Sequence, residues 1–362
     1  MTALFLLVTY GKISKSKPSY LQNKDSNKNI GMIKRRLTCT LFIIRKLKRG
    51  IIMEVIDVIE NSLHDSPPLT LVIGNFDSMH KGHQHMLQSA KDLMNDPNEK
   101  LAVLELSADP KRDSAEDSHQ KKITPEQDKL ALLDQYGVDR YYRIKSTSQT
   151  TKTTEERLGD DHLSRLPIKR LVIGDSLESD FSASKEELIR FCDREDIEVT
   201  VVPPVQSNGV IISSTQIRKF VQDGKMDAVH ALQGRPFTVT GKVIHGEKMG
   251  RKLGFPTINL GEIDAYVFPK PGVYLGSVGI YNGTSITEYW NVLISAGYRP
   301  TVNGQGYLVE AHILDYTGDL YDRTVSVSFL RYMREEIDFP DLDSLIQRME
   351  QDKLEAEVLL GL

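Results

Sequence analysis

Two histidines stand three positions apart in the stretch GNFDSMHKGHQ, residues 74–84: His80 and His83, with Gly82 directly before the second. The apolar run LTLVIG precedes this stretch and the amphipathic run HMLQSAKDLM follows it. The pair is therefore expected where a strand passes into a helix. Imidazoles at such a junction could bind a metal, move a proton, hold a phosphate or serve the structure alone.

Phosphate binding is the chemistry that this junction favours. In an open α/β sheet, ligands bind beyond the carboxyl ends of the strands, and a helix N-terminus there attracts anions. Gly82 lets the backbone approach a ligand closely, while His80 and His83 can donate hydrogen bonds to phosphate oxygens. A metal site is disfavoured because no cysteine or acidic residue stands at suitable spacing, and a catalytic zinc usually has three protein ligands.

A second set of polar residues begins another predicted helix, in ISSTQIRKF at residues 212–220. Ser213, Ser214 and Thr215 offer hydroxyls and exposed amides at the helix start, and Arg218 follows on the first turn. Such groups suit a triphosphate, which an arginine can bind with two parallel hydrogen bonds. The alternative is an ordinary Ser/Thr cap followed by a solvated arginine.

A third stretch, TGKVIHGEKMGRKLGFPTINL at residues 240–260, is rich in glycine. Its glycines allow a loop to wrap around ATP phosphates, although the Gly-Lys-Ser/Thr ending of a Walker loop is missing. Thr257 and Asn259 present oxygen atoms two positions apart, which suits Mg²⁺ bridging the phosphates.

Strands and helices alternate over the first half of the chain. Strands are expected at 69–76, 100–106, 140–144, 170–174 and 197–205. Helices are expected at 83–95, at 124–137 with Thr124 as cap and Gln127 completing a capping box, and at 184–196. This alternation predicts a parallel α/β sheet. A linker helix is expected at 213–234, and the polar stretch 145–161 reads as a mobile loop.

Beyond residue 235 the pattern changes to short β-rich segments between glycine turns. These segments, at 237–246, 272–281, 288–297, 306–316 and 323–333, predict a closed antiparallel barrel. A final helix at 341–361 has apolar residues at helical spacing and is expected to cover the barrel.

Composition limits the functional classes. The chain has 362 residues, 40% hydrophobic and 27% charged, which fits a globular protein of two domains. Its two cysteines, Cys39 and Cys192, form no metal-ligand pattern and favour a reduced, cytoplasmic protein. No apolar run reaches the roughly 18 residues of a membrane span.

The first 52 residues differ from the rest, with 12 Lys and Arg against one acidic residue, Asp25. The remainder has 34 basic and 49 acidic residues, about −15 net, and so predicts no basic face for nucleic acid. The segment could be a basic arm or a non-native extension. Met1, Met32 and Met53 are all possible starts; we favour Met53, with 1–52 disordered or poorly packed.

Together, GNFDxxHxGH and ISSTxIR resemble the nucleotidyltransferase superfamily, and more narrowly the adenylyltransferase half of bacterial bifunctional riboflavin kinase/FAD synthetases. The 240–260 stretch, with its Pro-Thr-x-Asn element, is very similar to the riboflavin kinase signature. GVYLG, SAGYRPT, VEAHILDYTGDLYDRTVSVSFLRYMREE and LIQRMEQDKLEA then follow in the family's order. The resemblance covers residues 53–362.

The resemblance implies a nucleotidyltransferase-like α/β domain at 53–235 and a six-stranded riboflavin-kinase-type β-barrel with a terminal helix at 236–362. It implies phosphorylation of riboflavin to FMN by ATP and Mg²⁺ in the second domain. Adenylylation of FMN to FAD, with release of pyrophosphate, belongs to the first. The oligomeric state is left open.

The resemblance also assigns roles to residues. Glu310 would be the kinase base, and His80, His83 and Arg218 would stabilise charge during adenylyl transfer. The ATP site of the first domain would comprise Gly74, Phe76, His80, Gly82, His83, Ser214, Thr215 and Arg218. That of the kinase would comprise Gly241, His245, Gly246, Gly250, Arg251, Gly254, Thr257 and Asn259, with the last two as metal ligands. The flavin loops would involve Tyr274, Arg299 and Arg331.

The first domain departs from the family at several places. Ser78 and Met79 stand where the family's FDGVH has Gly and Val, ELSADPKRD replaces a TFDPHP-like segment, and GDSLESDF replaces GxDFxFG. ATP-phosphate groups are kept while several flavin-side groups are not. Two alternatives therefore stay open: a riboflavin kinase whose first domain is degenerate, and a regulatory flavin- or RNA-binding protein. The glycine-rich loop, Thr257, Asn259 and Glu310 argue against the second.

Overall fold

The computed structural model describes residues 53–58, 67–106, 121–144, 163–175, 185–246, 250, 253–283, 285–301 and 304–361. All of them belong to one compact unit of the chain, 41–362. The basic segment 1–52, the polar stretch 145–161, Arg251 and most of the two divergent segments near 109 and 178 lie outside the described residues.

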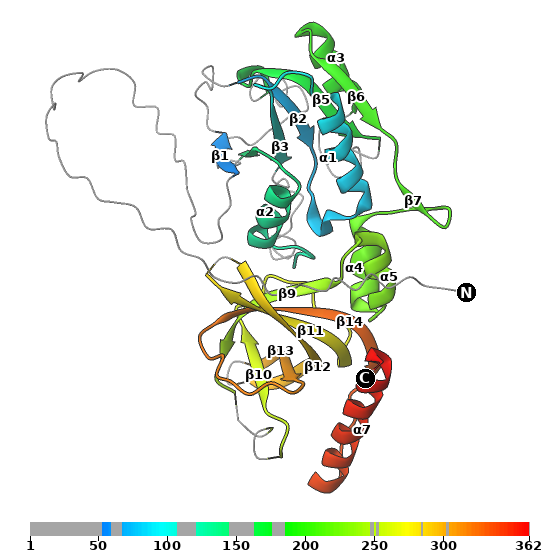
Figure 1. The fold of residues 1–362 in the computed structure, drawn as a ribbon. Coiled ribbons are helices and arrows are strands. Elements are labelled where there is room, and N and C mark those ends of the chain that lie inside the picture. The colour runs from blue at the N-terminus through cyan, green and yellow to red at the C-terminus, as the bar shows by residue number, and fades with distance from the viewer. Residues whose placement is uncertain are drawn as a thin grey trace, which may run out of the picture. The chain divides into compact units, whose positions relative to one another are not determined.

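A six-stranded parallel sheet forms the first half, in the order β1-β4-β3-β2-β5-β6 (Figure 1). This confirms the predicted fold class, and it adds one edge strand, β1, that the sequence pattern did not reveal. The strands are β1 Glu54–Val58, β2 Leu69–Ile73, β3 Lys100–Leu106, β4 Arg140–Ile144, β5 Ile168–Gly174 and β6 Glu198–Val202.

Helices cover both faces of this sheet, which is why β2 is buried along its whole length. Residues of α1, Lys81–Leu93, and α2, Glu126–Gln135, share an apolar cluster with Val72. Residues of α3, Lys185–Arg194, share the opposite cluster with Leu71. Adjacent residues of one strand therefore point into different cores, as the pleat requires.

Two local predictions were wrong. Thr124 does not cap α2: Pro125 is the N-cap and makes no side-chain cap bond, while the Thr124 amide donates to Asp77 instead. The linker helix is two helices, α4 Ser214–Gln222 and α5 Met226–Gln233. They are separated at Gly224, whose φ of 73° lies in the left-handed region and ends a helix.

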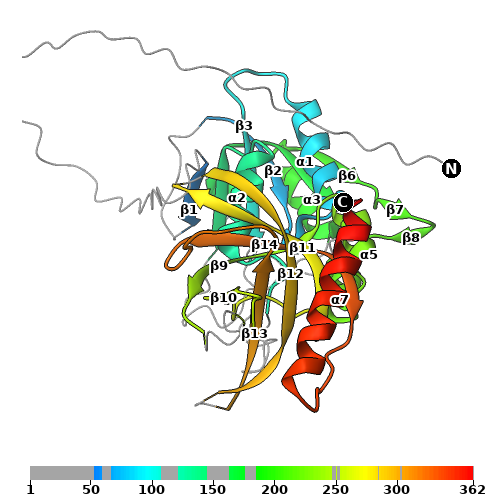
Figure 2. The same cartoon turned by 60° about the horizontal axis from the view of Figure 1, so that its bottom comes forward.

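The second half is a closed six-stranded barrel in the order β10-β13-β12-β11-β14-β9 (Figure 2). Its pairings are antiparallel, and β9 alternates buried and half-buried residues, the period-2 pattern on which the barrel prediction rested. The strands are β9 Phe237–Ile244, β10 Thr257–Gly261, β11 Gly272–Asn282, β12 Ser285–Thr301, β13 Gly304–Ile313 and β14 Thr324–Arg334.

The terminal helix α7, Leu342–Leu360, is capped by Asp341, whose carboxylate accepts the Ser344 amide. It packs on the barrel through Ala356, which is fully buried and belongs to the same apolar cluster as Leu275 and Leu293. None of the described helices is long and apolar enough to cross a membrane.

A short segment before α2 is hydrogen-bonded to the barrel side of the chain. Lys122 and Tyr266 form an isolated parallel bridge, in which the Lys122 amide donates to Ala265 and the Val267 amide donates to Lys122, both at 2.8 Å. The Tyr266 hydroxyl donates to Asp128 of α2 and accepts the Thr240 amide of β9 at 3.0 Å. The β2–α1 junction described next is joined to this same segment.

Candidate active sites

His80 is the N-cap of α1. Its Nδ1 accepts the amides of Gly82 and His83, at 3.1 and 3.3 Å. Because Nδ1 is an acceptor, the proton of the neutral imidazole is on Nε2, which is left to donate. The two amides that could have met a phosphate at this helix start are thus already engaged by the imidazole.

The rings of His80 and His83 are stacked, with centroids 3.8 Å apart and planes inclined by 14°. Burial lowers the pKa of His80 to about 4 and that of His83 well below its usual range, with the charge of Arg235 adding to both shifts. Both imidazoles are therefore neutral at physiological pH. The Nδ1 atom of His83 is buried and has no hydrogen-bond partner among the described residues.

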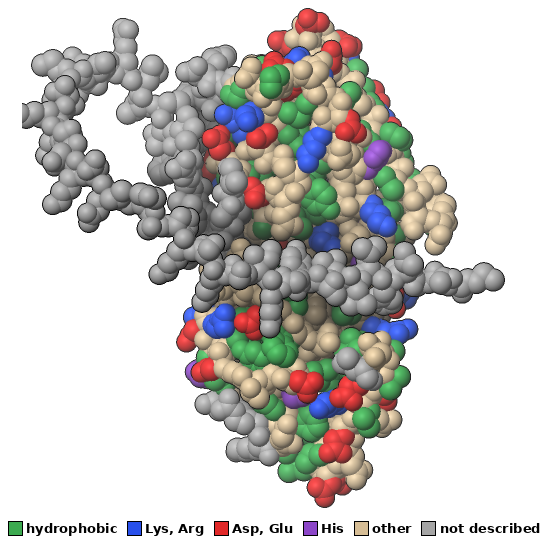
Figure 3. Space-filling model, viewed as in Figure 1, with side chains coloured by type: hydrophobic (Ala, Val, Ile, Leu, Met, Phe, Trp, Pro, Cys, Tyr) green, Lys and Arg blue, Asp and Glu red, His purple; other side chains and the backbone are tan. Residues whose placement is uncertain are grey.

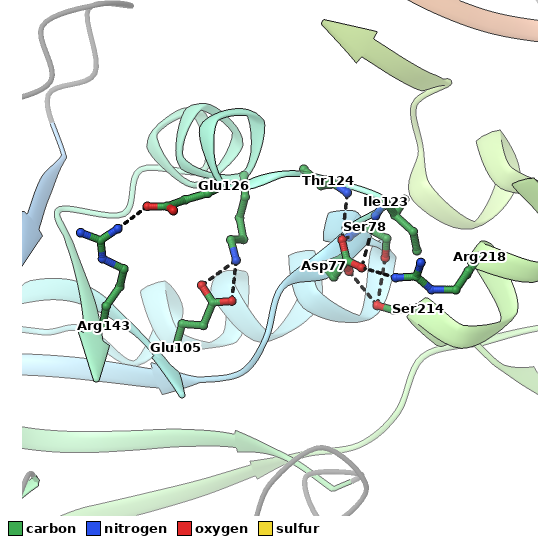
Figure 4. A network of polar contacts seen from close by, with 10 residues as sticks. Asp77, Ser78, Glu105, Ile123, Thr124, Glu126, Arg143, Ser214 and Arg218 are labelled. Atoms are coloured by element: carbon green, nitrogen blue, oxygen red, sulfur yellow. Dashed lines mark hydrogen bonds and ion pairs between the residues drawn. The ribbon is translucent and has the colours of Figure 1, made fainter. Parts of the chain in front are cut away.

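Asp77 joins this junction to two other segments (Figure 4). Its carboxylate accepts the Thr124 amide at 2.8 Å, the Ile123 amide at 3.3 Å and Arg218 Nη2 at 3.0 Å. Its carbonyl accepts the Ser214 hydroxyl at 2.7 Å. Sequence reasoning missed Asp77 as a site residue; its place between the apolar strand and the histidines was the only signal.

The structure brings the second predicted motif beside the first. Ser214 Oγ lies 3.1 Å from Ser78 Oγ, and Arg218 donates both to Asp77 and to the Lys121 carbonyl. Arg218 is thus held by the protein in this structure, with its remaining N–H groups available to a ligand. Ser213 caps α4 through its hydroxyl, and Thr215 is exposed.

Gly74 and Phe76 pack against the β2–α1 junction that carries the two histidines. A β-carbon on Gly74 would lie 2.9 Å from the Phe76 ring, so glycine is what allows the ring to fold back. Phe76 is fully buried, and its ring centroid is 5.0 Å from that of His83. Both residues therefore position the histidines through packing.

In the barrel, Thr257 and Asn259 lie on β10, and Asn259 stands directly opposite Glu310 of β13. A β-carbon on Gly246 would lie 2.4 Å from the Asn259 amide nitrogen. One on Gly250 would lie 2.4 Å from the Phe255 carbonyl oxygen. Gly246 therefore lies against Asn259, and a β-carbon on Gly250 would also lie 3.5 Å from the Thr257 hydroxyl, the two side chains that the sequence assigned to metal binding.

The other predicted kinase residues are placed differently. Gly241 lies inside β9. A β-carbon at this position would lie 2.5 Å from the Gly261 carbonyl oxygen, so glycine is needed here for the packing of the two strands. His245 directly precedes Gly246, and Gly254 is exposed with a φ of 85°. The His245 ring is 3.9 Å from the Tyr321 ring.

The predicted flavin residues do not form one group. Arg299 pairs with Glu336 at 2.6 Å, and the hydrogen bond to Glu336 raises the pKa of Arg299, with a further contribution from Glu310. Tyr274 is instead fully buried in the barrel core, where its hydroxyl donates to the Lys270 carbonyl and burial raises its pKa. Arg331 is exposed on β14.

A small open pocket lies beside Thr257. Aromatic and acidic side chains that the sequence reasoning missed form part of its wall, and His245 borders one of them, Tyr321. The lining residues are Val243, Pro256, Thr257, Ile258, Ile313, Tyr316, Gly318, Asp319, Leu320 and Tyr321.

The donor set at Thr257 and Asn259 suits Mg²⁺ only together with phosphate. The described residues contain no group of three His, Cys, Asp or Glu side chains that could hold a metal alone. A hydroxyl and an amide oxygen are neutral ligands, and Mg²⁺ usually completes its shell with substrate phosphates and water. The pair beside the glycine-rich segment fits that arrangement.

The fold and these sites define a nucleotide-handling protein with an α/β nucleotidyltransferase-like domain and a kinase barrel. The family model of FAD synthetase matches residues 63–216 and that of riboflavin kinase matches residues 233–360. A bifunctional riboflavin kinase/FMN adenylyltransferase of Listeria monocytogenes is 30% identical over 80% of this chain and 92% of its own. The Escherichia coli K12 protein of the same name is 31% identical over 81% and 93%.

Among solved structures, one titled a macrolide-efflux protein from Streptococcus pneumoniae matches with a TM-score of 0.73. It is 27% identical, over 84% of this chain and 98% of that one. The chain belongs to the family of bifunctional riboflavin kinase/FMN adenylyltransferases. This confirms the resemblance drawn from the motifs.

Proposed function

We propose that this protein makes both FMN and FAD, phosphorylating riboflavin in the barrel and adenylylating FMN in the α/β domain. The observation that carries the kinase part of the proposal is the pairing of Asn259 with Glu310 across two barrel strands, with Gly246 packed against the Asn259 side chain. The family matches over both halves support the same assignment. The degenerate-domain and regulatory alternatives have no comparable support.

In the kinase reaction, Glu310 accepts the proton of the riboflavin 5′-hydroxyl as its oxygen attacks the γ-phosphorus of ATP, and ADP leaves. Phosphoryl transfer depends mainly on positioning and charge neutralisation, so one carboxylate near the nucleophile is sufficient. Thr257 and Asn259 would hold Mg²⁺, which neutralises phosphate charge when bound. The pocket beside Thr257 would take the nucleotide, with Tyr316 and Tyr321 as its aromatic wall and His245 packed against the Tyr321 ring.

In the adenylylation, the phosphate of FMN attacks the α-phosphorus of ATP and pyrophosphate leaves. The FMN phosphate is already anionic, so no protein base is required. His80 donates from Nε2, and His83 stacks on the His80 ring and holds its direction. Thr215 and Arg218 complete the set of donors that stabilise charge on the departing pyrophosphate, while Ser214 holds the Asp77 carbonyl beside them.

We further propose that the protein acts in the cytoplasm on small-molecule substrates and does not bind nucleic acid. Figure 3 shows acidic and basic side chains intermingled over the visible face, whereas a nucleic-acid site is a basic stripe. Free riboflavin and ATP are cytoplasmic metabolites for such an enzyme.

The test is incubation of the full chain with riboflavin, ATP and Mg²⁺, followed by chromatographic separation of the flavins. Accumulation of FMN and then FAD supports the proposal. FMN alone supports the degenerate-domain alternative, and no conversion sinks both enzymatic assignments.

Glu310→Gln tests the kinase base. The change keeps the shape of the side chain but removes the proton acceptor, so we expect FMN formation to fall by about 10²–10⁴-fold. FMN-to-FAD conversion should remain, because His80 and Arg218 belong to the other domain. Glu288→Gln, on the exposed part of β12, is the matched control and should leave both rates unchanged. Full kinase activity in Glu310→Gln would refute the assignment.

A further inference from the structure

The backbone directly before His80 has an unusual conformation. Phe76, Ser78 and Met79 have φ values of 54°, 71° and 45°, in the left-handed region that non-glycine residues rarely occupy. This region is unfavourable for any residue with a β-carbon, because the β-carbon then lies too close to the following carbonyl oxygen. A turn of this kind persists only where its surroundings determine it strongly, and such turns cluster at functional sites.

The carbonyl groups of this turn are held by side chains from a distant part of the chain. Arg235 donates from Nη2 to the Ser78 carbonyl at 2.7 Å and from Nη1 to the Met79 carbonyl at 3.1 Å. Gln233 also donates to Ser78, at 3.0 Å, and Gln84 to Met79, at 2.8 Å. The guanidinium thus spans the two carbonyls that immediately precede the His80 cap.

Arg235 is itself fixed in place. It stands between Gly234, which ends α5 with φ 73°, and Pro236, which precedes the first barrel strand β9. Among the described residues, no carboxylate lies within ion-pair distance of its guanidinium, and burial lowers the pKa of Arg235 to about 10. Placing a cation here is unfavourable, and the two carbonyl dipoles offset the cost together with the nearby groups of Tyr136 and Asp128.

We propose that Arg235 is a positioning residue of the adenylyl-transfer site, one that fixes the Ser78–Met79 turn and through it the direction of the His80 imidazole. Both terminal nitrogens of Arg235 donate to the carbonyls of the turn, so the role we assign to Arg235 is to hold the turn and to act through His80. Its fork shape matters, because lysine carries a single ammonium and cannot hold two carbonyls in a fixed plane. The inference rests on the proposed FMN adenylylation.

The first test compares both reactions in Arg235→Gln. Loss of two charge-assisted hydrogen bonds should lower kcat/KM for FMN adenylylation by at least about ten-fold. The kinase reaction of the same preparation should stay within about two-fold. Arg235→Lys should give an intermediate loss. Arg190→Gln, at an exposed arginine of α3, is the matched control and should change neither reaction.

The second test is rescue by glycine. Glycine adopts left-handed φ values without cost. Ser78→Gly, added to Arg235→Gln, should therefore let the turn form with less dependence on the guanidinium. We expect the double variant to recover about half or more of the logarithmic loss in kcat/KM seen in Arg235→Gln, with Ser78→Gly alone as the reference for the double variant. An equal fall in both reactions, or no rescue by Ser78→Gly, would overturn the positioning role.

A third measurement does not depend on turnover. Hydrogen exchange of the peptide spanning residues 74–86 should be faster in Arg235→Gln by about ten-fold and return toward the native rate with Ser78→Gly. If the native protein forms no FAD, the proposed function fails while this exchange measurement still decides the role of Arg235. Unchanged exchange in Arg235→Gln would contradict it.

Discussion

The imidazole of His80 serves two purposes at once. One nitrogen satisfies the amides at the start of α1, and the other is left as a donor at the carboxyl edge of the sheet. A serine or aspartate would cap the helix equally well but would offer no N–H to a ligand. A histidine at position 80 therefore meets both requirements, an acceptor for the helix amides and an N–H donor for a ligand.

His80→Asn separates titration from capping. Burial lowers the pKa of His80 from 6.5 to about 4, so the unfolded chain binds more protons than the folded chain between these values. The free energy of unfolding should therefore be highest above pH 6.5 and fall by about 3 kcal/mol as the pH drops toward 4. Asparagine keeps a cap acceptor and does not titrate, so the variant should lose less stability over this range.

The measurement is urea denaturation at several pH values between 4 and 7.5. His85→Asn, at an exposed position of the same helix, is the matched control and should follow the native profile. Parallel profiles for His80→Asn and the native chain would show that another group controls the acid dependence.

Sequence reasoning identified the residue types of this site but not how they are held. His80, Ser214 and Arg218 belong to local motifs whose chemistry can be read from spacing. Asp77 and Arg235 depend on contacts 137 to 157 positions apart in the chain and on left-handed backbone angles. Neither property has a periodic signal in the sequence.

At the scale of elements, hydrophobic periodicity was a good guide to both domains. It failed where a single residue decides the outcome: Gly224 divides the linker into α4 and α5, and the Thr124 amide is taken by Asp77 rather than by a capping box. The edge strand β1 also escaped prediction. It is five residues long and, among the strands that the structure describes, pairs with β4 alone.

The docking of α7 depends on Asp352. This carboxylate is 4% exposed and accepts from Arg334 of β14 at 2.6–3.2 Å and from Arg348 at 2.9 Å. Asp352→Ala leaves two arginines without their shared acceptor and should lower the free energy of unfolding by about 3 kcal/mol in urea denaturation.

Glu357→Ala provides the comparison on the same helix. Its pair with Lys353, at 3.8 Å and partly exposed, should contribute less than about 0.5 kcal/mol. An Asp352→Ala effect as small as this one would mean that water replaces the lost acceptor at no cost.

For the whole molecule, the segment 121–124 connects the two catalytic halves by hydrogen bonds. It donates two amides to Asp77 and forms the bridge between Lys122 and Tyr266. The Lys121 ammonium also lies 3.2 Å from the centroid of the Phe268 ring. The two halves that the sequence describes as separate domains thus share one hydrogen-bonded segment.

Tyr266→Phe tests how much this connection contributes. The change removes the acceptor of the Thr240 amide and the donor to Asp128, both in a buried setting. We expect the midpoint of thermal unfolding to fall by several degrees, equivalent to about 1–3 kcal/mol. Tyr289→Phe, at a side chain 70% exposed, should leave the midpoint unchanged. If the thermal midpoint of Tyr266→Phe equals that of the native protein, the backbone bridge between Lys122 and Tyr266 is enough to maintain the connection.

The position of Arg235 also determines where the gene could be split into two. A first polypeptide that ends at Gly234 would leave the Ser78 and Met79 carbonyls without their charged donor, although every motif of that domain would be present. A second polypeptide can begin at Phe237, the first residue of β9, without loss to the barrel ladder. Natural or engineered fission of this enzyme should therefore keep Arg235 and Pro236 with the first polypeptide.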